Sequence, residues 1–163
     1  MARDPRAHET VRESVLDRLL DDAPEQHRDP PATREELMRR VLAAVRRDLE
    51  WLLGTRLTWV DDDLAAAEHA ARSIATFGLQ DFSHENIGNQ DAQQRLRRAI
   101  EQAILVFEPR LARVRVTCEG GEQNQRALRF RIEAVLHVEP IRESVAFDTV
   151  MELNGQTEVR DVP

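Results

Sequence analysis

The tripeptide Glu108-Pro109-Arg110 places a carboxylate and a guanidinium two residues apart, where helical apolar spacing gives way to strand spacing. Proline disfavours the α conformation in the residue before it, so the helix must end at Glu108. In an extended chain, residues two apart point to the same side, so the two charges can pair with each other or with another chain. Spacing alone favours the local ion pair, which at a surface stabilises little. The alternative is a rigid guanidinium that binds a partner's carboxylate or backbone carbonyls.

The other residues that could do chemistry are scattered. The five histidines include no i, i+4 pair, and Cys118 has no second cysteine with which to build a zinc site. Because Cys118 falls in a predicted strand, we expect a buried and unreactive thiol. The acidic run Asp61-Asp62-Asp63 lacks the alternation and central glycine of a calcium loop, and helix capping explains it better. We therefore expect no catalytic residue, no metal site and no cofactor.

Charge and composition argue against nucleic-acid and membrane partners. The 163 residues include 23 basic and 30 acidic side chains, for a net charge of −7, and no tyrosine. A nucleic-acid-binding domain usually presents a basic surface, often with aromatic side chains for stacking. The sequence has no apolar run of about 18 residues, the length that a transmembrane helix requires. With no visible secretory signal and a single cysteine, we expect a cytoplasmic protein that does not insert into a membrane.

The N-terminal part of the sequence predicts a tethered amphipathic helix from Glu9 to Leu20. Its apolar residues recur at helical spacing: Val11, Val15, Leu16, Leu19 and Leu20. Residues 22–32 are acidic and contain prolines, which is typical of an extended linker. So short a helix has little core of its own and should dock, either on its own domain or on a partner. We therefore divide the chain into a docking helix (1–21), a linker (22–32) and a single domain (33–163).

Three helices are predicted in the first part of that domain. A capping box, Thr33 with a glutamate three residues later, begins the first helix, which ends at Gly54. The second helix spans residues 64–76 and ends before Gly78, a residue suited to a left-handed conformation. The third helix spans residues 90–107, with its apolar side chains on one stripe.

After Pro109 the apolar spacing changes to two residues, which predicts strands. The alternation covers residues 114–118, 128–136 and 145–153, and a short last strand lies near 157–160. Pro140 interrupts the pattern, and glycine-containing turns separate the other strands. The predicted fold is α+β: N-terminal helices followed by a small, mainly antiparallel β-sheet packed on them.

Five segments, taken in order, resemble the TssE proteins. These are the baseplate wedge proteins of type VI secretion systems, related to a small wedge protein of contractile phage baseplates and once labelled lysozyme-like. The segments are residues 14–19 (SVLDRL), 48–56 (DLEWLLGTR), 73–83 (SIATFGLQDFS), 96–117 around Glu108-Pro109-Arg110, and the strands over 128–136 and 145–150. Gly54, Thr76 and Gln80 depart from the residues usual in that family. No single segment is specific to this family, but the occurrence of all five segments in the same order along residues 11–160 is specific to it.

The resemblance implies a structural subunit of a baseplate that contains TssK and docks at the inner membrane. Such a subunit binds a helical core bundle made by the wedge subunits TssF and TssG, and Glu108, Pro109 and Arg110 would contribute to that contact. The sheet would offer a free edge to the sheath subunits TssB and TssC by β-augmentation. The apolar residues of the N-terminal helix would dock on a wedge or sheath neighbour: Val15, Leu16, Leu19 and Leu20.

Two alternatives compete with this interpretation. A lysozyme-like peptidoglycan hydrolase needs two carboxylates across a cleft, one of which retains its proton. Arg110 instead favours the ionised form of Glu108, and the sequence marks no second acid, so we expect no enzymatic activity. The second alternative is a baseplate subunit of another phage-like contractile injection particle, which shares the architecture. The long N-terminal extension favours the type VI branch.

Overall fold

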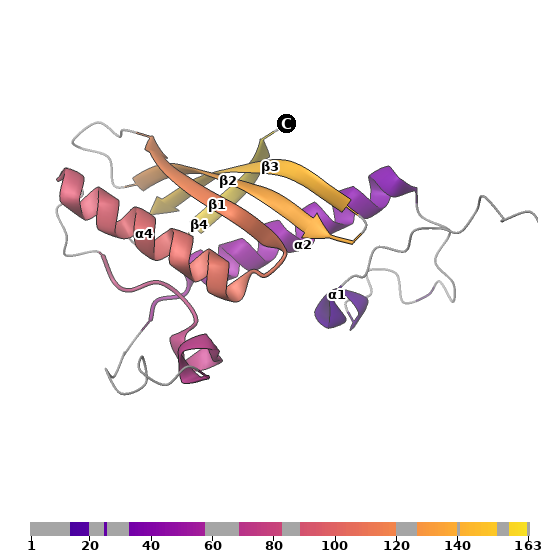
Figure 1. Cartoon of the computed structure of the whole chain (residues 1–163), viewed down its shortest axis with the longest axis horizontal. Helices are drawn as coiled ribbons and strands as arrows, with labels where there is room; N and C mark the ends of the chain where they lie inside the picture. Colours follow the sequence, from indigo (N-terminus) through magenta and orange to yellow (C-terminus); the bar gives the residue numbers. More distant parts are fainter. Residues whose placement is uncertain are drawn as a thin grey trace, which may run out of the picture.

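The chain forms two layers, a four-stranded antiparallel sheet with two long helices on one of its faces (Figure 1). The computed structural model describes residues 14–19, 25, 33–57, 69–82, 89–119, 127–139, 141–152 and 157–162. The helices are α2 (Arg34–Gly54) and α4 (Gln90–Phe107). The strands are β1 (Leu111–Glu119), β2 (Ala127–Val138), β3 (Ile141–Glu152) and β4 (Thr157–Val162), paired in sequence order. The predicted α+β class is confirmed.

The capping box predicted for α2 is present. The backbone N–H of Glu36 donates to the Thr33 hydroxyl at 3.3 Å, and the Thr33 N–H donates to the Glu36 carboxylate at 2.7 Å. These bonds satisfy two of the donors that a helix N-terminus otherwise leaves open. One face of α2 is buried against the sheet: Val41, Ala44, Val45, Leu49, Leu52 and Leu53.

Helix α4 has the bounds that the sequence predicts, and it lies along β1 (Figure 1). The side chain of Asn89 accepts from the Asp91 N–H at its start. The buried face of α4 meets the same core as α2: Ala92, Leu96, Ile100, Ala103 and Ile104. Because both helices bury an apolar stripe on one sheet face, the domain has a single continuous core.

Buried and more exposed residues alternate along the strands, and the buried residues form the sheet face that packs on the helices. In β2 every second residue from Phe130 to Val138 is buried, and in β3 Phe147 and Thr149 are buried. The sequence did not reveal an irregularity in β1. There the pairing register shifts between Ala112 and Arg115, and Arg113 has φ 55°. This β-bulge disturbs the outer strand next to the Glu-Pro-Arg tripeptide.

The predicted helix over residues 64–76 is wrong at its C-terminal end. Two single 3₁₀ turns, η1 (Ala70–Arg72) and η2 (Ile74–Thr76), are separated by Ser73, whose backbone is extended. The Ser73 hydroxyl donates to the Ala70 carbonyl at 2.8 Å and accepts from the Ala75 N–H at 3.2 Å. A side chain that bonds the backbone in this way competes with the helical pattern. Residues 61–68 lie outside the described part.

Gly78 has the positive φ that the sequence predicts, 117°. A Cβ atom at this position would lie 2.5 Å from the Thr55 carbonyl oxygen. That carbonyl accepts from the Leu79 N–H at 2.9 Å, and the Leu57 N–H donates back to the Leu79 carbonyl at 2.8 Å. The glycine therefore permits the close approach that joins the end of α2 to residues 77–82.

The N-terminal helix α1 (Val15–Leu19) is shorter than predicted. Ser14 is not helical, and its hydroxyl accepts from the Asp17 N–H at 3.1 Å, as an N-cap residue does. The prediction that the helix runs continuously from Glu9 is therefore wrong. Residues 9–13, Leu20, most of the predicted linker and the turns predicted within 120–126 and 153–156 lie outside the described residues.

Candidate functional site

The Glu-Pro-Arg tripeptide forms the turn between α4 and β1. Glu108 has φ −121° and ψ 77°, so it lies outside the α conformation, as expected for a residue before proline. Its N–H still donates to the Ile104 carbonyl at 2.8 Å, and its own carbonyl accepts from Leu111 at 3.0 Å. Pro109 is exposed between them. Backbone bonds on both sides of the proline therefore fix the turn, which we call the corner (Glu108, Pro109 and Arg110).

Arg110 and Glu108 form a bidentate ion pair. The Arg110 Nε atom lies 2.7 Å from Glu108 Oε1, and Nη2 lies 2.5 Å from Oε2. The backbone N–H of Arg110 also donates to Oε1 at 3.2 Å. Glu108 is only 4% exposed. The local pair suggested by the spacing is therefore present, but it is buried instead of lying at the surface.

Arg110 also contacts acids from two other helices. Its Nη2 atom lies 2.5 Å from Asp48 Oδ2 on α2, and its Nη1 atom lies 3.7 Å from Asp17 Oδ2 on α1. Arg47 bridges the same acids, at 2.7 Å from Asp17 Oδ1 and 2.9 Å from Asp48 Oδ1. Three carboxylates and two guanidinium groups thus join α1, α2 and the corner.

The surroundings of Arg110 and Asp17 favour the charged form of each side chain. Burial disfavours the charged guanidinium, but the hydrogen bond and charge of Glu108, and then those of Asp48, outweigh it and raise the pKa of Arg110. Burial also acts to raise the pKa of Asp17. Hydrogen bonds from Ser14 and Arg47, together with the charges of Arg47 and Arg110, lower that pKa overall.

Helix α1 is held by polar contacts and turns apolar side chains outward. Val15 is 73% exposed, Leu16 43% and Leu19 76%, while Asp17 reaches the corner and α2. Of the four predicted docking residues, Leu20 lies outside the described part. Clustered exposed apolar side chains often mark a protein-binding surface. The corner and α1 therefore form one candidate site, in which Asp17 ties a helix with exposed apolar side chains to Arg110 and Arg47.

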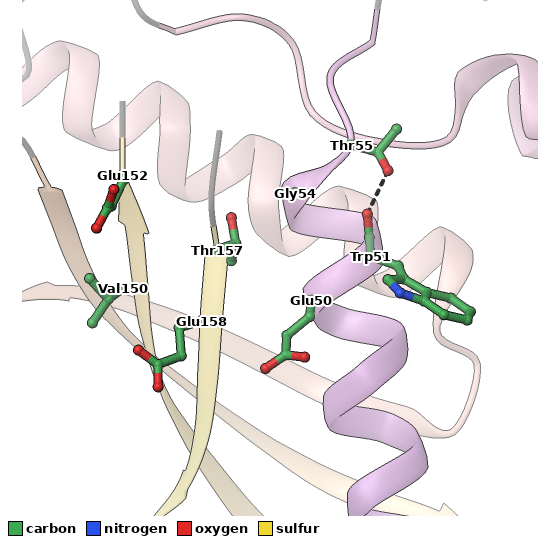
Figure 2. Close-up of a pocket in the computed structure, with 8 residues that line it drawn as sticks. All are labelled: Glu50, Trp51, Gly54, Thr55, Val150, Glu152, Thr157 and Glu158. Carbon is green, nitrogen blue, oxygen red and sulfur yellow. Dashed lines mark hydrogen bonds between the residues drawn. The ribbon is translucent and has the colours of Figure 1, made fainter. Parts of the chain in front are cut away.

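Little in the described chain resembles an enzyme site. A cavity of about 650 Å³ lies at the end of α2 and the start of β4, remote in sequence from the corner (Figure 2). No group of three or more His, Cys, Asp or Glu side chains in the described ranges is arranged to hold a metal ion. Cys118 is half-buried, and burial raises the pKa of its thiol although the charge of Arg97 opposes the change. The described helices include none long and apolar enough to cross a membrane.

Exposed apolar side chains on a short helix of a small two-layer domain are typical of a protein that binds other proteins. The family model described as baseplate wedge protein gp25 matches residues 39–141, which include most of α2, all of α4, the corner and the first two strands. The chain belongs to this family, as its sequence predicts. It is therefore a structural subunit of a phage-type baseplate wedge, a family whose members associate with other baseplate proteins. No curated protein matches the chain.

Proposed function

We propose that this chain is the wedge subunit of a type VI secretion baseplate, and that it binds the TssF–TssG core bundle through the corner and α1. The observation that carries the proposal is an exposed apolar helix face on α1, which the contacts of Asp17 with Arg47 and Arg110 hold against α2 and the corner. Its support from sequence is the ordered resemblance to TssE proteins, which includes α1 and the corner. The baseplate so formed would contain TssK and dock at the inner membrane from the cytoplasm.

The corner supplies a rigid polar element to this interface. Glu108 and Asp48 occupy Nε and Nη2 of Arg110, and within the described residues Nη1 makes only the 3.7 Å contact with Asp17. Nη1 therefore has donor capacity that a partner's carbonyl or carboxylate can use. Because Glu108 and Asp48 already fix the guanidinium plane, little side-chain entropy is lost when a partner binds.

Helix α1 supplies the apolar part. Burial of an exposed leucine or valine against a partner stabilises a complex by about 1.5–3 kcal/mol per side chain. The exposed apolar surface of α1 is thus large enough for a helix of the core bundle to pack against Val15, Leu16 and Leu19. In this proposal residues 1–21 act as a docking segment, residues 22–32 tether it, and residues 33–163 form the wedge domain.

The sheet supplies a second interface in the same proposal. Strands β1 and β4 are the outer strands, so each has one edge without a neighbouring strand in the described chain. A strand from the first ring of TssB and TssC would add to one of these edges, which would start sheath assembly from the baseplate.

The test is co-purification of tagged chain with co-expressed TssF and TssG. We expect Leu19→Asp to reduce recovery of both partners at least about ten-fold, because it places a charge in the apolar contact. Ile74→Asp is the matched control, since Ile74 is also apolar and is 91% exposed on η2. Arg110→Ala should reduce recovery too, and its stability must be measured in parallel.

Undiminished recovery of both Leu19→Asp and Arg110→Ala would contradict the proposed interface. The tagged chain can instead be co-expressed with the core-bundle proteins of an extracellular contractile particle. If it recovers those proteins but not TssF and TssG, it belongs to that other branch of phage-like machines.

A further inference from the structure

Asp17 joins α1 to the rest of the chain through two arginines that belong to different elements. Its Oδ1 atom lies 2.7 Å from Nη2 of Arg47 on α2, and its Oδ2 atom lies 3.7 Å from Nη1 of Arg110 at the corner. The Asp17 side chain is 14% exposed. Each of its two oxygens thus faces one guanidinium group, which is a suitable arrangement for binding a single carboxylate.

Other residues of the domain already hold the two arginines in place. Arg110 Nε lies 2.7 Å from Glu108 Oε1, and Nη2 lies 2.5 Å from Asp48 Oδ2. Arg47 donates to Asp48 Oδ1 from Nε at 3.0 Å and from Nη2 at 2.9 Å. None of these four bonds involves α1. Without the α1 carboxylate, both guanidinium groups would therefore stay in position, as a preformed site.

Apolar packing contributes little to the docking of α1. Its described apolar side chains are exposed, and none of them belongs to the hydrophobic core. Figure 1 shows this helix outside the two layers formed by the sheet and the long helices. A helix of five residues has little stability of its own, and partly exposed ion pairs add little to it. The docked position of α1 can therefore be exchanged for another position at small cost.

The acids beside the two arginines select the charge of the ligand. Asp48 and Glu108 balance the two guanidinium groups, so the α1 carboxylate gives the cluster one excess negative charge. Another single carboxylate would leave that charge unchanged. A phosphate dianion would add a further negative charge beside the same acids, which repel it. The site therefore fits an aspartate or glutamate side chain better than a phosphorylated one.

We propose that Asp17 is a displaceable internal ligand. It occupies a two-arginine carboxylate site in the free chain, and an acidic side chain of the wedge partner takes its place on assembly. Because residues 20–32 connect α1 to the domain, a released α1 stays nearby at an effective concentration on the order of 1 mM. Its apolar side chains then remain available to the same partner. The inference rests on the proposed function in that the TssF–TssG core bundle supplies the acid.

The free chain tests whether Asp17 alone docks α1 on a preformed site. The heteronuclear ¹⁵N NOE measures backbone motion on the nanosecond timescale, residue by residue. We expect Asp17→Asn to lower the NOE of residues 15–19 to that of a mobile segment, while the amides of α2 and the corner keep theirs. Asp91→Asn, which changes an exposed acid of α4, is the matched control and should alter neither. A rigid α1 or a mobile corner in Asp17→Asn would overturn the proposal.

Competition between two differently tagged full-length chains tests the displacement. The parent and Asp17→Asn are co-expressed with a limiting amount of TssF and TssG, and the ratio of the two tags is measured in the recovered complex. An internal ligand weakens the apparent affinity in proportion to the fraction of free sites that it leaves, so we expect the variant to be enriched about three-fold or more. Asp91→Asn should be recovered in equal amount with the parent. Equal recovery of Asp17→Asn would refute the proposal, and its depletion would show that Asp17 assists binding instead of competing with it.

Failure of this inference can be distinguished from failure of the proposed function. If Leu19→Asp and Arg110→Ala bind TssF and TssG as the parent does, the proposed interface is wrong, and the NOE still reports whether Asp17 docks α1. If those two variants lose binding but Asp17→Asn is not enriched, the interface stands and the internal ligand is refuted.

Discussion

Removal of the Arg110 side chain should destabilise the isolated domain, because it leaves the Glu108 carboxylate buried without its counter-ion. Glu108 is 4% exposed, and two of its three hydrogen bonds come from the Arg110 guanidinium. In Arg110→Ala only the bond from the residue 110 backbone N–H remains. Asp48 and Asp17 also lose a cation and retain only Arg47.

The magnitude follows from burial. Removing one partner of a buried ion pair costs about 3–5 kcal/mol. The Arg110 side chain retains 19% exposure, so water can reach the vacated space and the lower end of that range applies. We expect a loss of about 3 kcal/mol, which for a chain of this length lowers the melting temperature by about 6–12 °C.

A double-mutant cycle measured by urea denaturation isolates the pair. Glu108→Gln removes the buried charge, so the combination of Glu108→Gln with Arg110→Ala should be more stable than the sum of the two single losses by about 1–2 kcal/mol. Arg98→Ala, an exposed arginine on α4, is the matched control and should stay within about 0.5 kcal/mol of the parent. Strictly additive losses, or an Arg110→Ala variant as stable as the parent, would show that Glu108 does not depend on Arg110.

Two further changes test the parts that position the site. The pKa of Asp17 is lowered in the folded chain, so its carboxylate stabilises α1 docking above its ordinary pKa, and that contribution is lost as pH falls through the lowered value. Asp17→Asn should therefore cost about 1 kcal/mol near neutral pH and progressively less in acid, and a pH-independent loss in thermal melts would contradict the ion pair. Gly78→Ala should cost at least about 2 kcal/mol in urea denaturation, because of its positive φ and the contact with Thr55. Gly54→Ala, at the last residue of α2, should be nearly neutral, and similar costs for the two glycine variants would refute the reasoning.

Local patterns made most of the fold predictable. The capping box at Thr33 and the apolar stripe of α4 depend on residues three or four positions apart, and the strands depend on residues two apart. Because these signals depend only on residues close in sequence, they can be read without knowledge of the tertiary structure. They failed where one side chain decides between two local structures, as Ser73 does by bonding the Ala70 carbonyl and the Ala75 N–H.

The partners of the corner were not predictable in the same way. The pairing of Arg110 with Glu108 follows from their spacing, but Asp48 lies 62 residues from Arg110 along the chain. With 30 acidic residues in the sequence, nothing local distinguishes Asp48 and Asp17 from the others. The same holds for Glu50, which lies 109 residues from Val159. Contacts of this kind depend on how helices and strands pack against each other, and the spacing of apolar residues along the sequence does not specify that packing.

One turn of α2 connects the corner to the sheet edge. Arg47 and Asp48 belong to the charged network at the corner, and Glu50 accepts a hydrogen bond from the Val159 N–H of β4. The Arg47 Cζ atom lies 5.2 Å from the centre of the Trp51 ring, and Trp51 also lines the cavity. The negative charge of Glu108 at the C-terminal end of α4 opposes the helix dipole. Arg110 offsets it and at the same time ties that end to α2. The charged corner is therefore a structural joint that connects α1, α2 and the end of α4.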